Sequence, residues 1–79
     1  MQLYLGGHLS WYDSQKRKQV DVHLTQPTLL TQVLSDLSVP VGEIAVGVVN
    51  GNAIFSFDDV TVTDADQVEL YPPVGGGES

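Results

Sequence analysis

Apolar and polar residues alternate in three stretches of the chain, at residues 1–5, 20–25 and 67–71. Successive side chains of an extended strand point to opposite faces, so this alternation predicts strands with one buried face. The alternation is clearest at 20–25, where each valine or leucine is followed by a single polar residue. The polar residues at 10–19 predict a long hairpin loop between the first two strands.

After residue 27 the apolar spacing changes to that of an amphipathic helix. The residues that share one face of this helix are Leu29, Leu30, Val33, Leu34 and Leu37. Thr28 can cap the first turn by accepting a backbone N–H, and Pro40 cannot continue the helix. We therefore expect one helix that begins after Thr28 and ends near Ser38.

Two short apolar stretches surround Asn50-Gly51 and predict a second hairpin. Asparagine and glycine both tolerate positive φ, as a tight two-residue turn requires. Residues 44–49 are almost continuously apolar, which predicts a strand covered on both faces, and residues 53–55 return from the turn. Val60 and Val62 predict a further brief extended segment.

The predicted order of elements is strand, strand, helix, strand, strand, strand. One helix packed across one face of a sheet makes an α+β fold. If the last strand pairs parallel to the first, the result is a β-grasp (ubiquitin-like) roll with a mixed sheet of four to five strands. We assign this domain to residues 1–74. Residues 75–79 have nothing to pack and are expected to form a flexible glycine tail.

The composition excludes several classes of function. The 79 residues include no cysteine, which excludes disulfide frameworks, iron–sulfur clusters and thiol catalysis. His8 and His23 are too few for a metal site without several carboxylate ligands, and no nucleophile–base pair can be assembled from the sequence. We therefore expect neither a bound metal or cofactor nor an enzymatic activity of the chain's own.

The chain is acidic, with a formal net charge of −7. Nucleic acid and anionic membranes attract clustered basic residues, so neither is an expected partner. A basic protein surface is the complementary partner, although acidity can equally serve solubility alone. No apolar run approaches the ~20 residues of a membrane span, and the first residues do not form a signal peptide, so we expect a cytoplasmic protein.

The last part of the chain carries a resemblance to a known family. Residues 48–77 read VVNGNAIFSFDDVTVTDADQVELYPPVGGG. The Asn50-Gly51 turn, the Asp64-Ala65-Asp66 turn before a strand, and the ending that runs from Tyr71 into the glycines together resemble the ubiquitin-like sulfur carriers of the MoaD/ThiS family. The Pro-Pro dipeptide and the long loop at residues 10–19 are more similar to MoaD, the small subunit of molybdopterin synthase.

This resemblance implies a chemical role for the glycines. In such carriers an activating enzyme of the MoeB/ThiF type uses ATP to adenylate the terminal glycine, and sulfur transfer then gives a thiocarboxylate. The matching residue is Gly77, preceded by the tail residues Gly75 and Gly76. The large subunit of a synthase, or another sulfur acceptor, would consume the thiocarboxylate in molybdopterin or tungstopterin assembly. Glu78 and Ser79 follow Gly77, so we expect a processing protease to remove them first.

The resemblance also implies an apolar docking surface beside the tail. Tyr71 and Val74 lie next to the glycines in the sequence, and Leu5 would be their neighbour if the first and last strands pair. Exposed aromatic residues make good interface anchors, so Tyr71 is the preferred partner contact. Leu5 also fits an ordinary core position.

Other polar and aromatic residues have simpler structural interpretations. Asp64 and Asp66 are expected to form a turn rather than to bind a metal. The family often has glycine at the position of Ala65, where a positive φ would cost alanine about 1 kcal/mol. The basic side chains at 16–18 are expected in a solvated loop, and Trp11 is expected to fold back on the domain.

Two other functions are compatible with the same sequence. One is a ubiquitin-like modifier joined to lysines through Gly77. The other is a non-conjugating β-grasp interaction module that has lost the carrier chemistry, with Glu78-Ser79 as the mark of that loss. A thiocarboxylate on the free protein, isopeptide adducts on other proteins, or full-length protein alone would distinguish the three.

Overall fold

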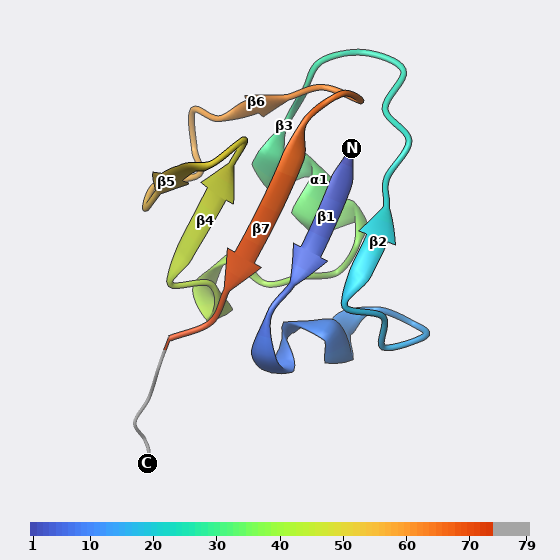
Figure 1. Ribbon diagram of the computed structural model, residues 1–79, viewed down its shortest axis with the longest axis vertical. Helices are drawn as coiled ribbons and strands as arrows, with labels where there is room; N and C mark the ends of the chain where they lie inside the picture. The colour runs from blue at the N-terminus through green and yellow to red at the C-terminus, as the bar shows by residue number, and fades with distance from the viewer. Residues whose placement is uncertain (74–79) are drawn as a thin grey trace.

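The structure, a computed structural model, describes residues 1–73 (Figure 1). Its main sheet consists of β1 (Gln2–Leu5), β2 (Gln19–Asp21), β4 (Val46–Val49), β5 (Asn52–Ile54) and β7 (Gln67–Tyr71). The strand order is β2-β1-β7-β4-β5, with β1 and β7 parallel and the other neighbours antiparallel. The prediction of an α+β fold with a mixed five-stranded sheet is confirmed, and the arrangement is β-grasp-like.

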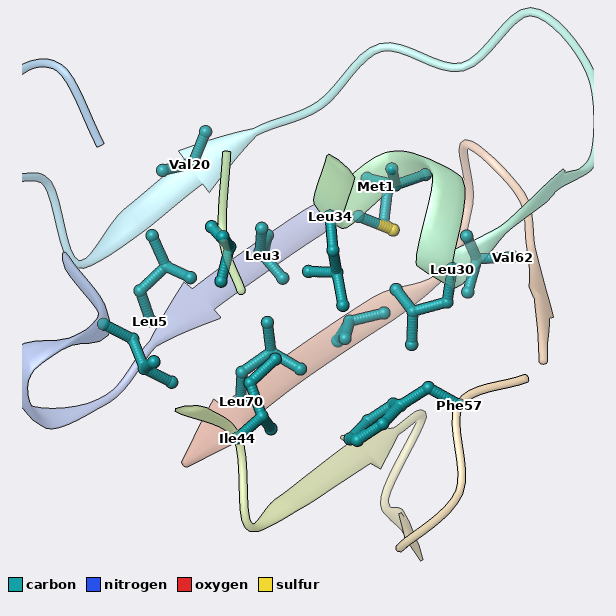
Figure 2. Packing of buried hydrophobic residues seen from close by; sticks show 14 residues of the cluster. Met1, Leu3, Leu5, Val20, Leu30, Leu34, Ile44, Phe57, Val62 and Leu70 are labelled. Carbon is teal, nitrogen blue, oxygen red and sulfur yellow. The ribbon is translucent and has the colours of Figure 1, made fainter. Parts of the chain in front are cut away.

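One face of this sheet is covered by the helix α1 (Leu30–Asp36), which lies behind β1 and β7 in Figure 1. The strand residues that point toward the helix are buried, among them Leu3 and Leu70. Figure 2 shows these two side chains and Leu34 of the helix directed into one apolar interior. The residues that alternate with them point to the other side of the sheet, which no helix covers among the described residues.

A second, two-stranded sheet joins β3 (Thr28–Leu29) to β6 (Thr61–Val62). The pairing confirms the extended segment at 60–62, and it explains why the predicted cap is wrong. Thr28 is held in the strand, its hydroxyl donates to the carbonyl oxygen of Gln26, and Leu29 takes the N-cap position without a side-chain bond. The helix ends at Asp36, close to the expected position.

The predicted hairpin loop at 10–19 contains regular structure. A 3₁₀-helix, η1 (Gly7–Tyr12), occupies its start, because Leu9 is fully buried and anchors this turn to the core. Trp11 is 71% exposed, so the prediction that it folds back on the domain is wrong. Further along, the guanidinium of Arg17 donates two hydrogen bonds to Asp13 and the Arg17 backbone N–H donates a third, which holds the pKa of that carboxyl well below its usual range.

The second strand is shorter than the alternation at 20–25 predicts. β2 ends at Asp21, and the backbone N–H of Val22 makes one last bond to the carbonyl oxygen of Met1. The next inward N–H, that of Leu24, donates to the Asp64 carboxylate at 2.9 Å. A side chain thus replaces the partner strand, so the alternating residues beyond Asp21 do not extend the sheet.

The strand predicted at 44–49 is covered on one face rather than two. β4 starts at Val46, and only Gly47 among its residues is buried, against the ring of Phe57. Val46 and Val48 point to the opposite face and are half-buried, because the helix and Phe57 lie on the same side of the sheet. Within residues 1–73, no helix has the length and apolar character needed to cross a membrane.

The predicted two-residue turn is confirmed at the tip of the β4–β5 hairpin. Asn50 has φ of +51° and Gly51 has φ of +87°, the two positive values that a type I′ turn requires. Ala65 is not among the residues with positive φ. The alanine therefore fits its turn without the backbone cost expected from the family's glycine.

Gly51→Ala should lower the free energy of unfolding by about 1–2 kcal/mol, because a Cβ disfavours the left-handed backbone at this position. A Cβ on Gly51 would meet no atom within 4 Å, so the effect is conformational rather than steric. Gly42→Ala is the matched control: it has the same open space but no positive φ, and should change stability by about 0.5 kcal/mol or less. Urea unfolding of both variants measures the difference, and equal stabilities would contradict the turn assignment.

Candidate functional site

The predicted site belongs to the C-terminal end of β7, the central strand of the main sheet. Tyr71 is the last residue of this strand, and Pro72 and Pro73 complete the described chain. The other residues assigned to the tail and its surroundings lie outside the described residues: Val74, Gly75, Gly76, Gly77, Glu78 and Ser79. The structure therefore describes the site only as far as Pro73.

Leu5 does not lie on a docking surface. The parallel register pairs Leu5 with Leu70, and both side chains point toward the helix. Leu5 is 1% exposed and appears in Figure 2 among the core residues. The expectation of a partner contact is corrected, because the position alternates with Tyr4 and falls on the covered face of β1.

Backbone hydrogen bonds from both sides fix the end of β7. The N–H of Gly6 donates to the carbonyl oxygen of Leu70 at 2.8 Å, and the N–H of Ala45 donates to that of Tyr71 at 2.8 Å. The strand is thus paired up to Leu70 on the β1 side and up to its final residue, Tyr71, on the β4 side. Pro72 and Pro73 have no N–H and cannot extend the ladder, which explains why pairing stops there.

Two 3₁₀-helices lie beside the residues that follow β7. Gly7 of η1 packs so closely on Pro72 that a Cβ on Gly7 would come within 2.8 Å of the proline Cγ. His8 of η1 lies 3.0 Å from the Glu43 carboxylate of η2 (Val41–Glu43), which ties these two turns together. The point at which the chain leaves the sheet is therefore held by its neighbours in space.

Tyr71 lies on the sheet face that α1 does not cover, which we call the open face. Its ring packs against Gly6, and the centroid of the ring lies 5.8 Å from the centroid of the Tyr4 ring. A Cβ on Gly6 would lie 2.9 Å from the Tyr71 ring, so this glycine makes room for the tyrosine. The Tyr71 hydroxyl donates to Glu69, and that hydrogen bond raises the pKa of the phenol.

The strand registers place further side chains on the open face beside Tyr71. These residues are Gln2, Tyr4, Gln19, Asp21, Val46, Val48, Ala53, Gln67 and Glu69. Sequence reasoning selected only Tyr71 from this face and did not identify Tyr4 or Glu69. The alternation in the sequence could have indicated Tyr4 and Glu69, because each of them lies between residues of its strand that were assigned to the core. The sequence does not give the register between β1 and β7, which places Tyr4 beside Glu69.

Asp64 and Asp66 form the predicted turn, and they also connect distant segments. Asp66 accepts the Thr63 N–H at 2.7 Å and the side-chain amide of Asn50 at 2.9 Å. Asp64 accepts the backbone N–H of Leu24. The bond from Asn50 is the main reason that the pKa of Asp66 is lowered, and the bond from Leu24 has the same effect on Asp64.

The open face carries both apolar and polar side chains beside the end of β7. Tyrosine, valine, amide and carboxylate side chains share the open face, so apolar contacts and hydrogen bonds are both available to a partner. Among residues 1–73, no group of three or more histidine, aspartate or glutamate side chains is placed to hold a metal ion. No protein-family model matches this chain, and no match among curated proteins was found.

Proposed function

We propose that this protein is a sulfur carrier whose Gly77 carboxylate is adenylated and then converted to a thiocarboxylate. The observation that carries the proposal is the run Tyr71-Pro72-Pro73-Val74 followed by Gly75-Gly76-Gly77, directly after the central strand of a β-grasp-like sheet. The resemblance to the MoaD/ThiS family in this run supports it. The position of β7 supports it further, because the strand is paired with β1 up to Leu70 and with β4 up to Tyr71.

The chemistry needs little from the carrier itself. The Gly77 carboxylate attacks the α-phosphorus of ATP and pyrophosphate leaves; hydrosulfide released from a sulfur donor then attacks the acyl carbon and displaces AMP to give the thiocarboxylate. An activating enzyme of the MoeB/ThiF type supplies the catalytic groups, so the carrier is a substrate rather than an enzyme and binds no cofactor. Glycine suits the acceptor position because it has no Cβ to hinder a narrow channel or an approaching nucleophile. The absence of cysteine is compatible, since the sulfur is carried by the backbone carboxyl group.

Molybdopterin or tungstopterin assembly in the cytoplasm is the pathway that we propose. The large subunit of the synthase would receive the thiocarboxylate, and a protease would first remove Glu78 and Ser79. The Pro-Pro dipeptide and the length of the segment between β1 and β2 favour this pathway over the thiamine pathway, because both features are more similar to MoaD than to ThiS.

Intact-mass spectrometry of the protein isolated from its own host tests the proposal. In cells that are making the cofactor, we expect a species that ends at Gly77 with one oxygen replaced by sulfur. Isopeptide adducts on other proteins without a thiocarboxylate would instead support a ubiquitin-like modifier. Detection of only the protein that still carries Glu78 and Ser79 would support the non-conjugating interaction module. The feature that favours this alternative is that these two residues follow Gly77.

A further inference from the structure

The open face contains a hollow of about 500 Å³ over β2, β1 and β7. Its side-chain lining comes from Gln2, Tyr4, Gln19, Gln67, Glu69 and Tyr71. The hollow lies beside the end of β7 but consists entirely of described residues. It is independent of the glycine segment, and so of the proposed sulfur chemistry.

Two aromatic rings form one wall of this hollow. Tyr4 and Tyr71 lie with their ring centroids 5.8 Å apart and their planes tilted by 47°. Gly6 makes room for the Tyr71 ring, because a Cβ at this position would lie 2.9 Å from it. The faces of aromatic rings carry partial negative charge and attract cations within about 6 Å.

Glu69 supplies a formal negative charge beside these rings. It is half-buried on the central strand, and its Oε1 accepts the Tyr71 hydroxyl. The ion pairs among residues 1–73 involve the carboxylates of Asp13, Glu43 and Asp64 and leave Glu69 out. The carboxylate therefore has capacity for a positively charged donor.

Lys18 directly precedes Gln19 of the lining, but the ion pairs among residues 1–73 join no lysine or arginine to Glu69. All three such residues lie at 16–18, where Arg17 is paired with Asp13, and residues 74–79 contain none. The other side chains of the hollow are mainly glutamines, whose amide oxygens accept hydrogen bonds. The net charge of −7 adds a long-range attraction for cations.

We propose that this hollow, which we call the Tyr4–Glu69–Tyr71 site, binds an arginine side chain of a protein partner. A guanidinium group is planar, so it can stack on a tyrosine ring while it donates to a carboxylate. Its five donors match the carboxylate and amide acceptors of the hollow better than the compact ammonium of lysine does. The partner is thus a protein that presents an exposed arginine to the open face.

The test is an NMR titration of the full chain with N-acetyl-argininamide. Saturable shifts are expected in the backbone amide signals of Tyr4, Glu69 and Tyr71. The isosteric but neutral N-acetyl-citrullinamide should cause no saturable shift, because it lacks the positive charge. Glu69→Gln should weaken arginine binding about ten-fold or more, since it removes the charge but keeps an acceptor for the Tyr71 hydroxyl.

Asp59→Asn is the matched control, because it likewise replaces an exposed carboxylate by an amide, outside the hollow and outside the ion pairs among residues 1–73. This variant should bind the probe as the parent does. Equal loss of binding in both variants would show general attraction to an acidic protein and would overturn the proposal. Shifts of the same amide signals on concentrating the protein without probe would show that a second copy of the chain occupies the hollow, which would also overturn the proposal. The spectra report directly whether each variant is folded.

Discussion

A chain that ends at Gly77 is expected to be adenylated by a MoeB/ThiF-type enzyme and ATP, whereas a chain that ends at Ser79 should show a loss of about 100-fold or more. In the longer chain the Gly77 carbonyl is an amide and cannot attack ATP. The only backbone carboxylate then lies up to roughly 7 Å further along the chain, and misplacement of a reacting group by about 1 Å can cost 100-fold in rate. Pyrophosphate release and intact-mass detection of the thiocarboxylate measure the two chains side by side.

Gly77→Ala in the shorter chain separates the role of the acceptor from that of chain length. The variant keeps a terminal carboxylate but adds a methyl group at the reacting residue, so it should fold normally and give less thiocarboxylate. Equal activation of the chains ending at Gly77 and at Ser79 would show that Gly77 is not the acceptor. The Tyr4–Glu69–Tyr71 site could still bind arginine in that case, because its test does not involve the glycines.

Leu70→Ala should lower the free energy of unfolding by about 2–5 kcal/mol, the largest stability effect that we expect. Leu70 has 0% exposure and lies on the central strand, where it pairs in register with Leu5 on one side and Gly47 on the other. Truncation leaves a cavity that neither neighbouring strand can fill without losing its hydrogen bonds. A domain of 79 residues has only modest stability, so the variant should be partly unfolded near physiological temperature.

Leu29→Ala is the control for this substitution, since the same atoms are removed from a side chain that is 48% exposed. Its effect should be about 0.5 kcal/mol or less. Urea denaturation monitored by circular dichroism compares the two variants with the parent protein. Similar destabilisation by both would mean that Leu70 does not belong to the core as the structure has it.

Much of the fold could be predicted from the sequence because it depends on local patterns. The period-two alternation in β1 and β7 distinguishes covered from open positions before any pairing is known. The Asn50-Gly51 turn follows from the backbone freedom of its two residues. Both predictions depend on residues that are close together in the sequence, so they can be made without knowing the tertiary contacts.

The errors arose where a contact between distant segments replaced a local one. Thr28 fits a helix cap by its chemistry, but pairing with β6 holds it in a strand. Leu24 continues the alternation of β2, but the backbone N–H of Leu24 donates to the Asp64 carboxylate instead of to a neighbouring strand. In each case a partner about 34 to 40 residues away satisfies the backbone group, and residue type alone does not identify that partner.

By itself, the sequence determined the existence of the main-sheet strands and of the helix, and a glycine-rich segment that follows the last strand. Only the tertiary structure decided that Leu5 is a core residue, and that Tyr4, Glu69 and Tyr71 form one hollow on the open face. The physical reason is the register between β1 and β7. Alternation tells which side of its own strand a residue occupies, whereas pairing between segments more than 60 residues apart decides which residues face one another.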